Sequence, residues 1–297
     1  MPPEPPDGPP VLRTPSTTTL PAFSRRRTSS PKGLRRQVLL RFREAVTASV
    51  VALLVTSIIH IPQAGFLAIF LATVGLSPQL ATLLDENRVA ILSSRLPPRQ
   101  ANLTTGANLL ALFTGVFLTF AAAAAYLGEA NLQAHFGFAF EASGVRLDSI
   151  LTRRFAHNAD IFWNNLGVFV AFFGISFLYR APGAMLAICW TAVVWAIILT
   201  VMIERGLAES TATARLDVLL VSLAILPHLL VEAASYALVA VSANFLSRAF
   251  AKYELSHPKV RAVGISVTKL LGLALLLLIL AAAFEATLPA LAGSLRG

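Results

Sequence analysis

The stretch GAMLAICWTAVVWAIILTVMI at residues 183–203 contains no charged side chain. At about 1.5 Å of rise per residue, it can cross about 30 Å of hydrocarbon as one α-helix. Other stretches of similar length and apolar character lie at residues 107–127, 161–179, 217–244 and 262–288. The sequence therefore predicts an all-α, polytopic transmembrane helical bundle with five core spans.

The composition excludes an ordinary soluble protein. Hydrophobic residues make up 56% of the 297, charged residues only 13%, and the mean hydropathy is +0.71. A soluble domain carries about 25% charged residues, and so few charges could not cover the surface of one this size. The single cysteine, Cys189, excludes an internal disulfide and is expected to be a small packing residue.

The N-terminal segment, residues 1–44, is basic and rich in proline. It has nine Lys or Arg residues against three acidic ones, and nine prolines lie between Pro2 and Pro31. Such a composition predicts disorder, because too little apolar surface can be buried to offset the entropy of ordering. Basic residues before a first apolar segment favour a cytoplasmic location and attraction to anionic lipid, rather than binding to nucleic acid.

Residues 45–106 form a second segment with two open questions. The apolar block 46–76 is interrupted around His60, so it is either one kinked span or a hairpin. His60 is expected to cap carbonyls freed by this break. After it, Pro78 is typical of a first helical position, and apolar residues then recur at helical spacing. The prediction for 78–96 is an amphipathic helix on the membrane surface, with a solvated linker helix as the alternative.

Loop charges give an orientation to the remaining segment, 107–291. The loop 245–261 is basic and is expected to be cytoplasmic, which places 204–216 and the long polar segment 128–160 outside. That outer segment carries an apolar strip formed by Phe136, Phe138 and Phe140. If the N-terminal tail is also cytoplasmic, 46–76 must enter and leave on one side, which favours the hairpin.

Ionisable residues inside spans are candidates for function because they are costly there. His228 and Glu232 are four residues apart, so they stack on one face of the 217–244 helix, directly after Pro227. Pro227 is expected to disrupt that turn and to free a carbonyl. The pair is either a structural contact that holds helices together or part of an ion or proton pathway.

Four further polar residues complete the candidate intramembrane site. Lys269 is predicted to pair with Glu232, or else to extend its charge to the cytoplasmic face. Glu285, near the outer end of the last span, could be an interfacial carboxylate. Asn164 and Asn165 begin the 161–179 span, where a helix-packing role is expected.

The chain has no recognisable catalytic motif. HExxH, Gly-x-Ser-x-Gly, P-loop and Rossmann patterns are all missing from the sequence. We therefore expect no enzyme, no cofactor and no metal site. An intramembrane hydrolase that uses His228 and Glu232 is the least supported alternative.

The core, residues 107–291, resembles the stage II sporulation protein M family of integral membrane proteins. ILPHLLVEAASYALVA (225–240) is similar to that family's Leu-Pro-His…Glu…Ala segment, although Leu229 stands where a glycine often follows the histidine. LILAAAFEATLPAL (278–291) resembles its closing helix. IFWNNLGVFVAFFG (161–174) is similar to its asparagine-bearing second core helix.

This resemblance implies a bacterial inner-membrane protein that acts as a scaffold or subunit of a cell-envelope complex. Its partners would be envelope or membrane proteins, and the 128–160 loop and the 78–96 helix are the expected contact surfaces. A transporter or channel subunit with a polar site at His228 and Glu232 is the alternative. The run Ala121 to Ala125 would permit close helix packing, within one chain or in a homo-oligomer.

Overall fold

The computed structural model describes residues 31–59, 61, 63–92, 96–142, 158–208 and 211–294, and its regular elements are helices. Residues 1–30 and His60 lie outside this part. The helices are α1 (Pro31–Ile58), α2 (Ala64–Leu92), α3 (Pro98–Ala142), α4 (Asn158–Tyr179), α5 (Ala181–Ala208), α6 (Ala212–Lys252) and α7 (Pro258–Ser294).

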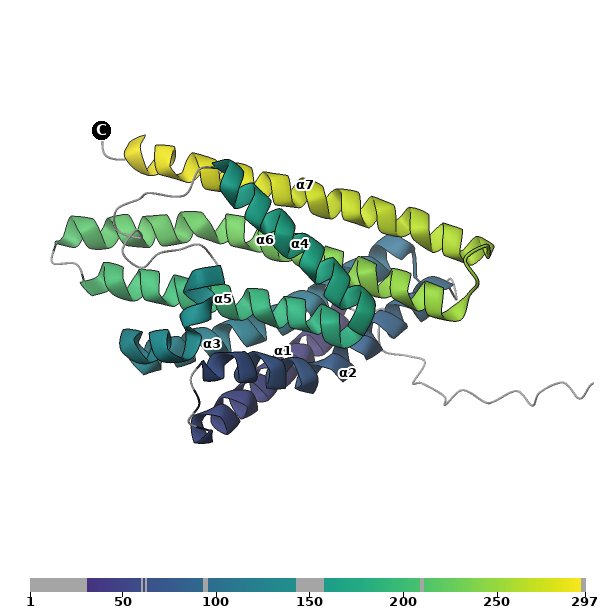
Figure 1. Ribbon diagram of the computed structural model, residues 1–297, viewed down its shortest axis with the longest axis horizontal. Coiled ribbons are helices and arrows are strands. Elements are labelled where there is room, and N and C mark those ends of the chain that lie inside the picture. The colour runs from purple at the N-terminus through teal and green to yellow at the C-terminus, as the bar shows by residue number, and fades with distance from the viewer. Residues whose placement is uncertain are drawn as a thin grey trace, which may run out of the picture.

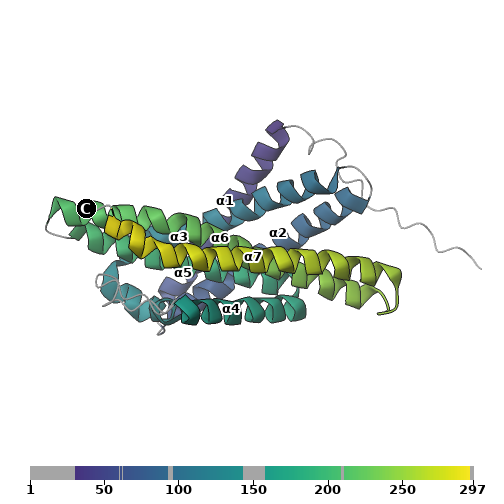
Figure 2. The same cartoon turned by 90° about the horizontal axis from the view of Figure 1, so that it is seen from above.

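Helix α5 is the centre of the bundle. It packs against α2 and α3 on one side and against α4 and α6 on the other, while α1 covers α2 and α3, and α7 covers α6 and α4. Figure 1 shows α5 among these neighbours, and Figure 2 shows α1, α2 and α3 diverging from the common direction of α6 and α7. In the most apolar 18-residue stretch of each helix, 72% of α5 is buried inside the protein, against 22% of α7. Helix α7 therefore exposes most of its apolar residues on the surface of the bundle.

Six helices in the described part are long and apolar enough to cross a membrane. They are Ala64–Ile91, Pro98–Leu127, Phe162–Tyr179, Ala181–Ala208, Ile225–Lys252 and Pro258–Phe284. These include the five predicted core spans and add α2. The chain is therefore a multi-pass membrane protein with an all-helical fold.

The block 46–76 forms a hairpin rather than one kinked span. Helices α1 and α2 pack against each other, with Gly75 of α2 beside the Cβ of Ala48. The connection uses a left-handed residue, Gln63 (φ 54°), whose N–H donates to the carbonyl of Ala134 at 3.2 Å. The hairpin turn is thereby held against the far end of α3.

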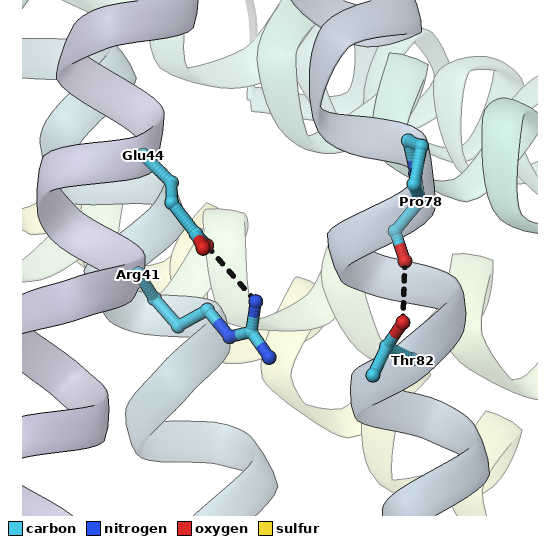
Figure 3. Close-up of polar contacts among 4 residues, drawn as sticks. All are labelled: Arg41, Glu44, Pro78 and Thr82. Carbon is cyan, nitrogen blue, oxygen red and sulfur yellow. Dashed lines mark hydrogen bonds and ion pairs between the residues drawn. The ribbon is translucent and has the colours of Figure 1, made fainter.

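Two predictions about the N-terminal third were wrong. Residues 31–44, assigned to a disordered tail, form the first half of α1, where Arg41 and Glu44 are paired at 2.9 Å (Figure 3). Residues 78–92 are not a separate surface helix but the continuation of α2, with Pro78 inside it. In the turn after the proline, the hydroxyl of Thr82 donates to the Pro78 carbonyl at 2.9 Å (Figure 3).

Tertiary packing explains why α2 does not end at Pro78. Leu80, Leu83 and Leu84 are buried against the rest of the bundle rather than facing a membrane surface. A proline inside a helix costs about 3 kcal/mol or more. Close packing of the three leucines against neighbouring helices offsets this cost.

The first part of the polar segment 128–160, up to Ala142, folds onto the bundle. Gly128 adopts a left-handed conformation (φ 70°) at a kink, and helix continues beyond it to Ala142. Phe138 stacks on Phe66 of α2 with ring centroids 3.8 Å apart and lies 5.3 Å from Trp190 of α5. The predicted aromatic strip therefore packs inside the protein, while residues 143–157 lie outside the described part.

Candidate intramembrane site

Two side chains of α6 donate hydrogen bonds to the backbone of α7 and fix the register of this helix pair. The hydroxyl of Ser235 donates to the carbonyl of Ala274 at 2.7 Å, and His228 Nδ1 lies 2.8 Å from the carbonyl of Ala281. From one contact to the other, the chain moves back seven residues in α6, from Ser235 to His228, and forward seven in α7, from Ala274 to Ala281. The two helices therefore run antiparallel. The alanines let the backbones approach closely enough for these contacts.

His228 and Glu232 meet in the interior of the protein, as their spacing predicts. Their side chains are only 3% and 5% exposed, and His228 Nε2 lies 3.4 Å from Glu232 Oε2. Trp195 of α5 meets the imidazole in an edge-to-face contact, with centroids 5.9 Å apart. The site is therefore enclosed by α5, α6 and α7.

The hydrogen bond to Ala281 decides which nitrogen of His228 carries a proton. A carbonyl oxygen only accepts hydrogen bonds, so Nδ1 must donate. In the neutral imidazole, Nε2 is then an acceptor that faces the carboxyl group of Glu232. Two acceptors at that separation repel each other unless one proton is held between the two side chains.

Glu232 is not fully satisfied in this arrangement. Its Oε2 atom is buried and makes no hydrogen bond, although His228 Nε2 is adjacent. A buried carboxyl oxygen without a donor costs about 1–3 kcal/mol, or more if it is charged. Other buried polar atoms of the described part, among them both amide atoms of Asn244, also have no partner. Glu232 differs from them because it is ionisable and lies beside His228.

The predicted pair between Glu232 and Lys269 does not form. Ser235 is level with Ala274, its hydrogen-bond partner, so in these antiparallel helices Glu232 is level with residue 277. Lys269 lies eight residues before that position. The two positions are thus about 12 Å apart along the helices. Lys269 is also exposed, whereas Glu232 is buried. The midpoints of the two spans predict a different register from the one that the hydrogen bonds of Ser235 and His228 set.

Pro227 does not break α6. It is exposed, and α6 continues through it from Ala212 to Lys252. The helix is therefore not broken at this turn, although the proline supplies no N–H to the carbonyl one turn earlier. The site depends on side chains packed between intact helices, without an unwound segment.

The other predicted site residues are dispersed. Asn164 is exposed on α4, and Asn165 is buried with its backbone carbonyl 3.5 Å from the hydroxyl of Tyr236. The side chain of Glu285 lies outside the described part. Among the described residues, neither asparagine forms a hydrogen bond with His228 or Glu232.

Sequence reasoning missed Ser235 and Trp195. Ser235 follows His228 by seven residues and could have been found from that heptad spacing. Trp195 gave no signal, because its position against His228 depends on how α5 and α6 pack. The described residues also include no group of three or more His, Cys, Asp or Glu that could hold a metal ion.

No protein-family model, curated protein or solved structure matches the chain.

Proposed function

We propose that this protein is a membrane transporter or channel subunit in which His228 and Glu232 bind and release a proton. The observation that carries the proposal is the unsatisfied Glu232 oxygen beside a histidine whose Nδ1–H is already committed to Ala281. One proton between Nε2 and Oε2 makes the pair neutral overall. This proton is then exchanged when water or a substrate reaches the site.

The packing of the chain supports this function over a scaffold. Within the described residues, the apolar side chains of the two surfaces expected to bind envelope partners pack inside the protein. Phe136, Phe138 and Phe140 of the outer segment are buried, and so are the leucines after Pro78. The His228–Glu232 pair retains a buried carboxyl oxygen for which the described residues supply no hydrogen-bond donor.

Infrared difference spectroscopy tests the proposal without knowledge of a substrate. Purified protein in lipid vesicles would be stepped through the pH range in which Glu and His titrate. The expected result is a carboxyl band that changes with pH in the native protein and is lost in Glu232→Gln. Ser235→Ala, a nearby polar change, should keep the band. If native protein and Glu232→Gln give the same difference spectrum, Glu232 exchanges no proton and the proposal fails.

A scaffold or subunit of a bacterial cell-envelope complex is the second candidate. It is favoured by the segments that resemble the stage II sporulation protein M family, which also suggest the inner membrane with a cytoplasmic N-terminus. Envelope proteins, or a second copy of the chain, would then be the partners. Deleting residues 143–157, a stretch between α3 and α4, should abolish recovery of such partners while insertion persists. Unchanged recovery would remove this loop from the scaffold hypothesis.

A further inference from the structure

Lys269 occupies an unusual place for a charged residue. It lies within the Pro258–Phe284 span of α7, yet its side chain is exposed. Val267 and Ala274, in contrast, are buried on the face that packs against α6. Two residues correspond to about 200° around a helix, so Lys269 points away from α6. Its ammonium group therefore faces the surroundings of the protein.

The residues on either side of Lys269 locate the edge of the hydrocarbon layer. On its C-terminal side the exposed residues are apolar, and they include Leu273, Leu276 and Leu280. On its N-terminal side Ser266 and Thr268 are exposed beside Ile265, so polar side chains first join the apolar ones on the exposed surface there. A charge deep in the hydrocarbon costs about 2.5–3.5 kcal/mol or more. We therefore place the edge of the layer near Lys269, at the first exposed polar side chains of this span.

This position agrees with the depth of the site in α6. Glu232 is level with residue 277 in the register set by Ser235 and Ala274. Residue 277 is eight residues beyond Lys269, or about 12 Å into a layer about 30 Å thick. The His228–Glu232 pair is thus near the middle of the membrane.

A second cation lies on the same outward half of α7. Arg261 is exposed and precedes Lys269 by eight residues, about 12 Å along the axis and about 80° around it. Neither side chain forms a hydrogen bond or ion pair within the described part of the protein. The acidic residue closest in sequence, Glu254, lies in the turn before α7. Two unpaired cations therefore bracket the headgroup layer on one lipid-facing surface.

We infer that Arg261 and Lys269 together bind the phosphate of an anionic phospholipid at this edge of the membrane. Lys269 can extend its flexible stem out of the hydrocarbon toward Arg261, because helical side chains lean toward the N-terminus of their helix. A guanidinium group also binds phosphate with two parallel hydrogen bonds. An anionic lipid is favoured because a zwitterionic headgroup carries its own cation beside the phosphate. This site is separate from the basic N-terminal tail and does not depend on the proposed proton function.

Native mass spectrometry of the full-length protein from nanodiscs tests the site. The discs would contain equal amounts of phosphatidylglycerol and phosphatidylcholine. The native protein should retain phosphatidylglycerol preferentially, and Lys269→Gln and Arg261→Gln should each weaken this preference by roughly fivefold. Arg99→Gln removes an exposed cation at the start of α3 and should change nothing. Lys269→Arg should retain the preference, which separates loss of charge from misfolding.

Two outcomes would overturn the site. Lys269→Gln that keeps the full preference would show that this lysine does not bind lipid. Equal losses in Lys269→Gln, Arg261→Gln and Arg99→Gln would mean that the attraction is a general effect of positive charge. A native protein without any preference for phosphatidylglycerol would count against the site in the same way.

Discussion

Replacing Glu232 by glutamine distinguishes a shared proton from a permanent ion pair at the centre of this protein. The substitution keeps the shape of the side chain and places an amide group 3.4 Å from His228 Nε2. Because Nδ1 already donates to Ala281, a neutral His228 presents Nε2 as an acceptor. The glutamine amide can then donate to that nitrogen in place of the proton.

The two hypotheses predict stability losses of different size. If the pair shares one proton, the amide replaces that hydrogen bond, and the free energy of unfolding should change by less than about 1 kcal/mol. If His228 is instead permanently protonated, its imidazolium loses its counter-ion when Glu232 is neutralised, and the buried charge is left uncompensated. Breaking a buried ion pair in this way costs about 3–5 kcal/mol. The proposed proton site predicts the smaller loss.

Equilibrium unfolding of the purified protein in mixed micelles measures this difference. Ser235→Ala is the reference, because it removes one hydrogen bond between α6 and α7 without changing charge. Such bonds contribute about 0.6 kcal/mol on average within membranes, and about 1.7 at most. A loss of 3 kcal/mol or more in Glu232→Gln, well above that of Ser235→Ala, would refute the shared proton.

Two further predictions concern the fold and the orientation. Gly115→Ala places a Cβ 2.6 Å from the Cβ of Ala45 on α1. This overpacking should lower the free energy of unfolding by about 1–3 kcal/mol. An unchanged value would mean that α1 does not pack against α3 at Gly115. Cysteines introduced at Gln63 and Ser256 should react with an impermeant maleimide from opposite sides of the membrane. The native Cys189 is buried and should give no background, and labelling of both from one side would contradict a hairpin that crosses the bilayer.

Hydropathy and local spacing were sufficient for much of the architecture. The five core spans appear as helices, and the i, i+4 spacing brought His228 and Glu232 together, because both depend only on neighbours along one helix. Local rules failed at Pro78, where the sequence is typical of a helix start. The helix continues there because its leucines are buried by other helices, and no local pattern reports that burial.

The aromatic strip shows the same limit. Alternating phenylalanines in a polar segment were visible in the sequence, but the residues that would cover them were not. Phe138 packs on Phe66 and Trp190, which are far away in the chain. A segment that appears available for partners can thus be part of the core of its own protein.

The sequence alone determined that this is a helical multi-pass membrane protein with a histidine and a glutamate on one helix face. Long apolar runs and a period of 3.6 residues contain that information locally. Only the tertiary structure decided which groups this face meets: the Ala281 carbonyl and Trp195, with Lys269 left outside. The physical reason is that register and rotation between helices follow from close packing of small residues across the interface. Hydropathy along either helix does not encode how those surfaces fit.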